Sequence, residues 1–394
     1  MRRLRTLSTR RLQASVAVVA ALAVTGGIAQ AALNRSDPKP RPIALDRAVT
    51  AALRAPDVAG ITARVKFTNS LLPSGALPRG SASPLAAGAD GRVWLAEDGR
   101  FRIELQSGGG DAQIVSDGKR LSIYDAASNT VYVADVPQDR KAKREQRHQP
   151  ATLAGVQKTL RSLSGFWSVS GARPTSTAGQ PTYTVRIAPK DDGGLLGAAE
   201  LAWDAARGVP LRAAVYAQGQ PEPVLELEAT EVSYGRVPAA DLKAAPPAGA
   251  KVVEIDPQTT DEKGRPSRVR GVQDVQRHLD FPLAAPAELA GLPRREVRLV
   301  RHQDGPGAVS VYGKGLGAIA VFQRKASDEA QKGPMAGGSR GDVRLPQINI
   351  GGATGTELAT ALGTVVTFER NGVAYVVAGS VPPVAAESAA RGLR

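Results

Sequence analysis

The residues that could carry out chemistry in this 394-residue chain are few and scattered. There is no cysteine, which excludes disulfides, thiolate catalysis and cysteine-ligated zinc. The three histidines, His148, His278 and His302, are not at metal-ligand spacing with one another or with a carboxylate pair. No Ser/Lys or Cys/His nucleophile motif can be assembled from the local sequence. We therefore expect no catalytic residue, no metal and no cofactor, in a protein that is not an enzyme.

Two glycine-rich segments resemble phosphate-binding loops, which place backbone N–H groups at the start of a helix. Gly313-Lys-Gly-Leu-Gly317 lies between two predicted strands, so we interpret it as a hairpin turn. Gly351-Gly-Ala-Thr-Gly355 precedes a predicted helical turn at 357–362, but no Lys-Ser/Thr pair follows it. The tripeptide Arg340-Gly-Asp342 resembles an adhesion motif, and in a charged loop we attribute it to chance.

The net charge of +14 suits an anionic membrane surface or a nucleic acid. The basic residues are scattered along the chain without interleaved aromatic residues, so we expect no nucleic-acid partner. The run at 138–148 holds five Lys and Arg residues; it is either a solvated loop or a contact with anionic lipid.

The N-terminus predicts export. Five arginines precede Ala14, an apolar segment extends to Ile28, and Ala29-Gln30-Ala31 has the form of a cleavage site. Residues 12–34 are uncharged and long enough to span a bilayer, so residues 1–31 are either a signal peptide or a retained N-terminal membrane anchor. The proline-rich residues 32–42 form an extended tether. We expect the protein at the outer face of a bacterial cytoplasmic membrane, anchored or released.

Residues 43–252 are rich in alternating strand patterns. A helix is predicted at 43–55 and another at 152–163, and short strands bounded by Gly, Asp and Asn turns fill most of the remainder. The predicted strands are 61–67, 92–96, 101–106, 114–117, 121–124, 130–136, 166–170, 182–188, 198–204, 210–217 and 224–234. The long segment 69–91 is either a disordered insertion or an apolar flap carrying Leu71, Leu72, Leu77 and Leu85.

Residues 253–271 are polar and contain Pro257, Gly264 and Pro266, which is typical of a linker. Residues 272–394 have their own elements. We predict helices at 272–279 and 384–392, strands at 296–302, 308–313 and 318–324, a loop at 331–341, and a hairpin of 365–370 with 373–378 through Asn371-Gly372.

Alternation places a set of apolar residues on one face of the first sheet. We expect this face to hold Val93, Leu95, Phe101, Ile103, Leu105, Leu121, Ile123, Val131 and Val133. If helices cover the face completely it is a core, and if they leave part of it open it is a lipid site. Each CH₂ of an acyl chain buried there would contribute about 0.8 kcal/mol.

Several motifs resemble a known family. Tyr183-Thr-Val-Arg-Ile-Ala-Pro-Lys190, Trp203-Asp-Ala-Ala-Arg-Gly-Val-Pro-Leu-Arg212 and Val232-Ser-Tyr234 are similar to the LolA/LolB-like lipoprotein-carrier family, in its high-GC Gram-positive form. In the second part, Val309-Ser-Val-Tyr-Gly-Lys-Gly-Leu-Gly-Ala-Ile-Ala-Val-Phe322 resembles a hairpin of RseB/MucB-type sigma-factor regulators. Asn371-Gly-Val-Ala-Tyr-Val-Val-Ala-Gly-Ser-Val-Pro-Pro383 resembles the end of the same domain.

The resemblance implies an α+β fold: a curved antiparallel sheet, or half-barrel, with plugging helices, and a smaller α+β C-terminal domain. It implies that the apolar face takes an acyl lipid or lipoprotein. It also implies that the C-terminal domain binds a membrane-bound anti-sigma factor, for which we select Tyr312, Leu316 and Phe322. The function expected is a lipid- or lipoprotein-binding sensor or carrier in an envelope-stress pathway. The alternative is a regulator that binds only the anti-sigma factor and has no lipid cavity.

Overall fold

The computed structural model describes residues 37–72, 83–126, 129–136, 152–190, 194–243, 248–254, 269–302, 305–326 and 345–393. The predictions for residues 1–31, 138–148 and 331–341, and for most of the linker 253–271, lie outside these ranges. None of the helices within the described ranges has the length and hydropathy that a membrane-spanning helix needs.

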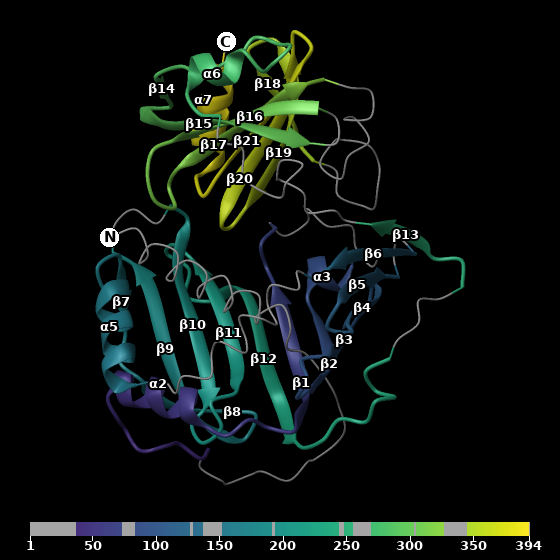
Figure 1. Cartoon of the computed structure of the whole chain (residues 1–394), viewed down its shortest axis with the longest axis vertical. Helices are drawn as coiled ribbons and strands as arrows, with labels where there is room; N and C mark the ends of the chain where they lie inside the picture. Colours follow the sequence, from purple (N-terminus) through teal and green to yellow (C-terminus); the bar gives the residue numbers. More distant parts are fainter. Residues whose placement is uncertain are drawn as a thin grey trace.

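The N-terminal part forms one large curved sheet, drawn in the lower half of Figure 1. Its strand order is β13-β6-β5-β4-β3-β2-β1-β12-β11-β10-β9-β7, and β8 pairs with β9. All pairs are antiparallel except that of β13 with β6. The strands are β1 Gly60–Asn69, β2 Ala89–Ala96, β3 Phe101–Ser107, β4 Gly110–Ser116, β5 Arg120–Asp125, β6 Thr130–Asp135, β7 Trp167–Val169, β8 Arg173–Thr177, β9 Gln180–Pro189, β10 Leu196–Asp204, β11 Pro210–Ala217, β12 Pro223–Tyr234 and β13 Lys251–Glu254.

Three helices accompany this sheet: α2 (Leu45–Arg54), α3 (Pro84–Ala87) and α5 (Leu153–Leu163). Ala48 of α2 is buried against Tyr183 and Trp203 of β9 and β10. Helix α5 lies beside α2, and Gln157 Nε2 donates a hydrogen bond of 2.6 Å to Asp46 Oδ2. Helices α2 and α5 thus cover the β9–β10 end of the sheet, and α3 contacts β1, β3 and β4. The predicted α+β class is confirmed.

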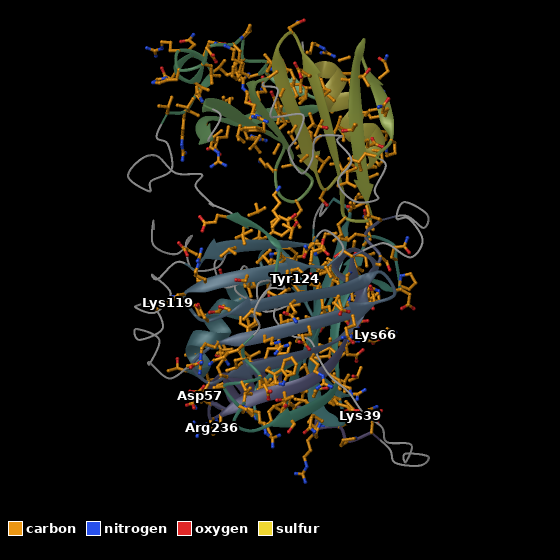
Figure 2. The ribbon with its side chains drawn as sticks, turned by 90° about the vertical axis from the view of Figure 1, so that its right-hand side faces the viewer. Lys39, Asp57, Lys66, Lys119, Tyr124 and Arg236 are labelled. Carbon is orange, nitrogen blue, oxygen red and sulfur yellow. The ribbon has the colours of Figure 1, made fainter. Side chains whose placement is uncertain are left out.

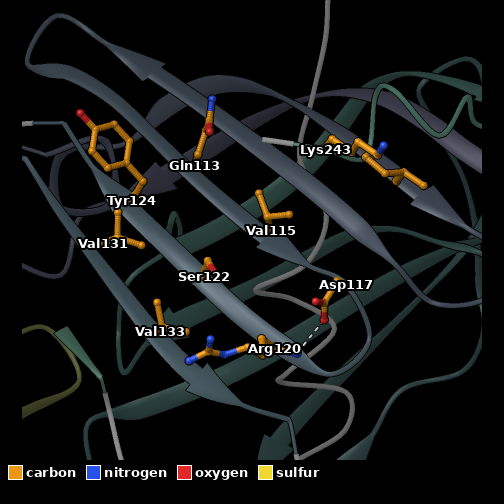
Figure 3. Close-up of a pocket in the computed structure, with 10 residues that line it drawn as sticks. Gln113, Val115, Asp117, Arg120, Ser122, Tyr124, Val131, Val133 and Lys243 are labelled. Carbon is orange, nitrogen blue, oxygen red and sulfur yellow. Dashed lines mark hydrogen bonds between the residues drawn. The ribbon is translucent and has the colours of Figure 1, made fainter. Parts of the chain in front are cut away.

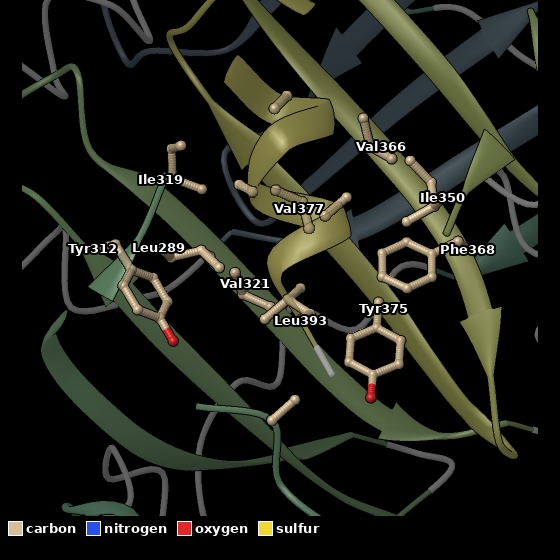
Figure 4. Close-up of a cluster of buried hydrophobic side chains, with 14 of the residues drawn as sticks. Leu289, Tyr312, Ile319, Val321, Ile350, Val366, Phe368, Tyr375, Val377 and Leu393 are labelled. Carbon is tan, nitrogen blue, oxygen red and sulfur yellow. The ribbon is translucent and has the colours of Figure 1, made fainter. Parts of the chain in front are cut away.

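The C-terminal part forms a second, antiparallel sheet of order β14-β15-β16-β17-β21-β20-β19-β18. Its core, shown in Figure 4, lies between the sheet and helix α7, whose Ala386, Ala389 and Ala390 are fully buried. The elements are α6 Val272–Gln276, β14 Glu288–Leu289, β15 Leu292–His302, β16 Gly305–Tyr312, β17 Ile319–Lys325, β18 Gln347–Ile350, β19 Ala353–Thr360, β20 Gly363–Arg370, β21 Val373–Gly379 and α7 Pro383–Gly392.

The turns of the second sheet test the glycine-rich predictions. Gly313-Lys-Gly-Leu-Gly317 is the turn between β16 and β17, as predicted. The prediction of a helical turn at 357–362 is wrong, because Glu357 pairs with Val366 within the β19–β20 hairpin. Gly351 and Gly352 form the β18–β19 turn with positive φ. This segment therefore does not begin a helix, and it lacks the helix N-terminus that a phosphate-binding loop of the expected type requires.

The turn between β10 and β11 explains the most specific motif of the sequence. Asp204 is 1% exposed and accepts hydrogen bonds from the backbone N–H groups of Ala206 and Arg207, at 2.8 and 2.9 Å. Its other oxygen, Oδ2, accepts from Tyr234 Oη at 2.7 Å and from Arg207 Nη1 at 3.2 Å. The carboxylate therefore ties the β10–β11 turn to the end of β12.

Gly208 ends this turn with φ +68°, and a Cβ atom there would lie 2.3 Å from the carbonyl oxygen of Ala52 in α2. Only glycine lets the helix backbone approach the turn this closely. The motif thus fixes α2 on the sheet as well as the turn itself.

Replacing Gly208 with alanine should destabilise the protein more than the same change at Gly219. Both glycines have left-handed φ, but a Cβ at Gly219 meets no atom within 4 Å. We expect Gly219→Ala to lower the free energy of unfolding by about 1 kcal/mol and Gly208→Ala by about 2–4 kcal/mol. Urea unfolding of both variants measures this, and equal losses would contradict the close approach of α2.

Asp204→Asn should remove a pH-dependent part of the stability. Burial alone raises the pKa of Asp204, but the hydrogen bonds from Tyr234, Arg207 and Ala206 outweigh it and lower the pKa below its usual value. Because the folded-state pKa is depressed, the contribution is complete above the unfolded-state pKa of about 3.9 and is lost as the pH falls through the folded value.

We expect Asp204→Asn to cost about 2 kcal/mol at pH 7, with the difference from wild type shrinking below about pH 4. Urea unfolding between pH 3 and 7 measures it. The exposed Asp57→Asn serves as control and should change stability by less than about 0.5 kcal/mol. Parallel curves for wild type and Asp204→Asn at all pH values would refute the role of the carboxylate.

Candidate functional site

The candidate site is the inner face of the first sheet, whose central rows are apolar, with Ser116, Asp125 and Thr130 on the same face nearer the strand ends. Directly paired residues of antiparallel strands point to the same side. One such row crosses β1 to β6 through Ala63, Val93, Ile103, Ile114, Ile123 and Tyr132. A second row continues it across β9 to β1 through Val185, Leu201, Ala213, Leu227 and Phe67.

The register places seven of the nine predicted residues on this inner face. They are Val93, Leu95, Phe101, Ile103, Leu105, Leu121 and Ile123. Ile114 and Tyr132 lie on the same face and were not predicted. The alternation of β4 could have identified Ile114, since Ala112, Ile114 and Ser116 share a side.

Val131 and Val133 were predicted on the same face, and this is wrong. Val131 pairs with Tyr124 and Val133 with Ser122, on the opposite side of the sheet from Ile123 and Tyr132. The sequence Thr130-Val-Tyr-Val-Ala134 is apolar at consecutive positions, so it has no alternation from which the side could be read.

Burial of the inner face decreases from the centre of the sheet toward β6. Val93, Ile103 and Leu105 are 0%, 1% and 3% exposed, packed in one cluster with Leu211 and Leu227 from the other half of the sheet. Leu121 and Ile123 on β5 are only half-buried. The centre of the face is thus filled by the chain's own side chains, whereas its β5–β6 end retains exposed apolar surface.

A segment following β1 covers part of the inner face. Asn69 anchors it: its Nδ2 donates to the carbonyl oxygen of Leu85 at 2.7 Å, and its Oδ1 accepts from the N–H of Leu71 at 3.0 Å. Leu85, on α3, packs against the central cluster. Leu72 is half-buried, and Leu77 lies outside the described residues.

The prediction of an irregular segment over 69–91 therefore holds only in part. Residues 84–87 form helix α3, and β2 already begins at Ala89. We call the described ends of this region, residues 69–72 and 83–88, the cover segment.

The cover segment also touches the second sheet. The N–H of Ala361, in the β19–β20 turn, donates a hydrogen bond of 2.8 Å to the carbonyl oxygen of Leu71. Because Asn69 connects Leu71 to Leu85, a short chain of hydrogen bonds and packing contacts links the inner face to the second sheet.

A second contact joins the two sheets at the start of β10. The N–H of Leu195 donates to Ser380, with 3.1 Å to its carbonyl oxygen and 3.0 Å to Oγ. Ser380 Oγ in turn donates to the carbonyl oxygen of Leu362 at 2.8 Å. A Cβ on Gly194, which has φ +62°, would lie 2.0 Å from the carbonyl oxygen of Ser380. This contact therefore requires glycine.

The three residues selected for partner binding lie in different environments. Tyr312 is 0% exposed in the core of the second sheet, so the prediction that it forms part of a binding surface is wrong. Leu316, in the β16–β17 turn, is 40% exposed. Phe322 is half-buried and pairs with Val309 and Val376, on the side of the sheet opposite Val321 and the α7 core.

Charged groups lie on the outer face of the first sheet, where they neutralise one another. Glu200 accepts hydrogen bonds from Arg212 Nη1 at 2.9 Å, Tyr216 Oη at 3.0 Å and Arg186 Nη1 at 3.2 Å. Burial opposes ionisation of Glu200, but these hydrogen bonds outweigh it and lower its pKa. This network stabilises the outer face.

The described residues include no group of three or more His, Asp or Glu side chains placed to hold a metal ion. The ring of His278 is exposed and its Nδ1 lies 2.8 Å from the carbonyl oxygen of Asp274. His148 lies outside the described residues. The site is therefore one of apolar contact and of mechanical connection between two sheets.

No protein-family model matches the chain. A search of curated proteins finds no match. Among solved structures, the MucA/MucB complex of Pseudomonas aeruginosa contains a similar chain, with 16% identity, coverage of 87% of this chain and 95% of that one, and a TM-score of 0.41.

Two shorter solved structures are similar to about half of this chain. A LolA superfamily protein from Nitrosomonas europaea has 10% identity, covers 51% of this chain and 98% of its own, and has a TM-score of 0.21. A putative outer membrane lipoprotein-sorting protein domain from Vibrio parahaemolyticus has 11% identity, covers 50% and 95%, and has a TM-score of 0.18. These solved structures include members of the groups that the sequence motifs resemble.

Gly194→Ala should loosen the contact between the two sheets. Gly179 has a similar φ of +69° but no atom within 4 Å of a Cβ, so Gly179→Ala controls for backbone strain. Because the new methyl group displaces Ser380, we expect the Leu195 amide to exchange with solvent about tenfold faster in Gly194→Ala, and unchanged in Gly179→Ala. Hydrogen exchange measured by NMR checks this. Equal protection in both variants would contradict the contact.

Proposed function

We propose that this chain is an extracytoplasmic sensor or carrier that holds an acyl chain of a lipid or lipoprotein on the inner face of the first sheet. Its C-terminal part passes the signal to a membrane-bound anti-sigma factor. One observation carries the proposal: the cover segment packs on the inner face through Leu85 and hydrogen-bonds to the second sheet through Leu71.

The acyl chain would lie at the β5–β6 end of the inner face. There Leu121 and Ile123 are half-buried, and Ile114 adjoins them. Each CH₂ group transferred from water to such a surface contributes about 0.8 kcal/mol, so binding needs no specific polar group. This agrees with the apolar composition of the face.

Occupation of that end would displace Leu85 or shift the cover segment along the sheet. Because Asn69 holds both Leu71 and Leu85, such a shift changes the hydrogen bond between Leu71 and Ala361. A ligand alters a distant site only through contacts that differ between the bound and free states. The Leu71–Ala361 contact is the one we assign to this role.

We propose that residues 272–394 form the partner-binding domain, that 253–271 link it to residues 43–252, and that Leu316 and Phe322 contribute to the binding surface. The solved MucB structure is of a complex with MucA. For this chain, the partner we propose is a membrane-bound anti-sigma factor, which the sequence resemblance implies. The signal-like residues 1–31 support a location on the outer side of the membrane.

The alternative is a regulator that binds only the anti-sigma factor. The filled centre of the inner face favours it, since Val93 and Ile103 are at most 1% exposed. The two functions differ in whether the half-buried β5–β6 end takes a ligand.

Lipid extraction and mass spectrometry of protein purified from the envelope distinguish them. We expect acyl lipid to copurify with wild type and to fall by about one chain per protein in Ile123→Glu, because a charge on the inner face opposes an acyl chain. Lys119→Glu, an exposed change in the turn of the same hairpin, should leave the lipid unchanged. Circular dichroism confirms that both variants fold.

Absence of lipid from wild type would reject the sensor and leave the alternative. A photo-cross-linking residue at Leu316 then tests that alternative, which predicts an adduct with a membrane protein. If neither lipid nor adduct is found, both functions are rejected.

A further inference from the structure

The outer face of the first sheet carries a pocket separate from the inner face. It has a volume of about 420 Å³, within the usual range of small-molecule sites. Figure 3 shows Val131 and Val133 of β6, Val115 of β4 and Tyr124 of β5 around it. Leu242 and Lys243, which follow β12, complete it.

The wall that Leu242 and Lys243 form is built from the segment 235–243, which we call the strap. The strap leaves β12 and crosses behind β2 and β3, where Val237 and Leu242 pack on Trp94. Arg102 pins it, because its Nη1 donates to the carbonyl oxygens of Lys243 at 3.0 Å and Asp241 at 3.3 Å. The guanidinium carbon of Arg102 also lies 5.1 Å from the centre of the Trp94 ring.

The floor of the pocket is mainly aliphatic, with Ser122 between Val115 and Val133. Val131 and Val133 are 1% and 9% exposed, and Leu242 is 6% exposed. These two valines are the ones that the sequence pattern assigned to the inner face. They lie instead on the outer face, where they form the base of a different site.

Most polar groups at the rim already have partners. Arg120 pairs with Glu254 at 2.9 Å and Asp135 at 3.5 Å, and Asp117 accepts from two backbone N–H groups at 2.7 Å. Gln113 donates to Glu104, and Tyr124 donates to Asn129. Lys243 is exposed, and no partner of its ammonium group is found among the described residues.

We propose that this pocket binds a single alkyl chain with an anionic end group, with the chain on Val115, Val131, Val133 and Leu242 and the anion at Lys243. The three valines and Leu242 favour an alkyl chain over a wholly polar ligand, since a buried polar group without a partner is unfavourable. Among the described residues of the rim, Lys243 is a charged group whose ammonium has no hydrogen-bond or ion-pair partner, and its positive charge favours an anion. The site is independent of the acyl chain proposed for the inner face, since the two lie on opposite sides of β5 and β6.

Decanoate and the neutral decan-1-ol are the probes, titrated calorimetrically into the full chain. The variants are Val133→Glu in the floor, Lys243→Glu at the rim and Ile123→Glu on the opposite face as the matched control. We expect Val133→Glu to remove one decanoate site that Ile123→Glu retains. Lys243→Glu should weaken decanoate at that site about five- to tenfold and leave decan-1-ol unchanged, because it reverses the charge facing the anion.

Equal decanoate binding by wild type and Val133→Glu would overturn the proposal. Lys243 is exposed, so its variant tests the charge even if Val133→Glu does not fold. If Lys243→Glu binds decanoate as wild type does, the anion is not held there and the proposal fails. Loss of a site only in Ile123→Glu would leave the inner-face function standing and reject this pocket.

Discussion

The pairing of β1 with β12 unites the first sheet. Strands β1 to β6 follow one another along the chain, and so do β9 to β12. Among the described strands, the pairing of residues 61–69 with 225–234 is the one that joins the two series. The register shifts between Arg64 and Val65, which adds twist at the junction. Without this non-local pairing the inner face would be divided, because Leu211 and Leu227 could not pack on Val93 and Ile103.

The same junction explains why the inner face is unevenly filled. Near β1 and β12, side chains from both series meet and exclude water. Toward β5 and β6, no described strand stands opposite, and the cover segment with its four-residue helix α3 is short. The tightest packing of the inner face therefore lies at the β1–β12 junction, and its exposed apolar surface lies at the β5–β6 end. A ligand at that end would not compete with the contacts that maintain the sheet.

Much of this could be predicted from local sequence, because hairpins and amphipathic strands are local. The Asn371-Gly372 hairpin was predicted from its turn residues, which adopt φ of 51° and 71°. Errors arose where the local sequence does not determine the structure. Val131 and Val133 lie in a continuous apolar run, which does not indicate the side of the sheet. Strand β13 is short and exposed, and its partner β6 precedes it by more than a hundred residues. The Leu71–Ala361 hydrogen bond uses backbone atoms only, so no side chain in the sequence marks it.

The strap has a mechanical consequence for the curved sheet. It leaves β12 near Arg236, labelled in Figure 2, and lies on the outer face of β2 and β3, against Trp94 and Arg102. A tighter curl of the sheet would change the distance from β12 to β3, yet the strap is continuous with β12 at one end and hydrogen-bonded to Arg102 at the other. The strap should thus resist further curling of the sheet, which would otherwise close the β5–β6 end, where apolar surface remains exposed.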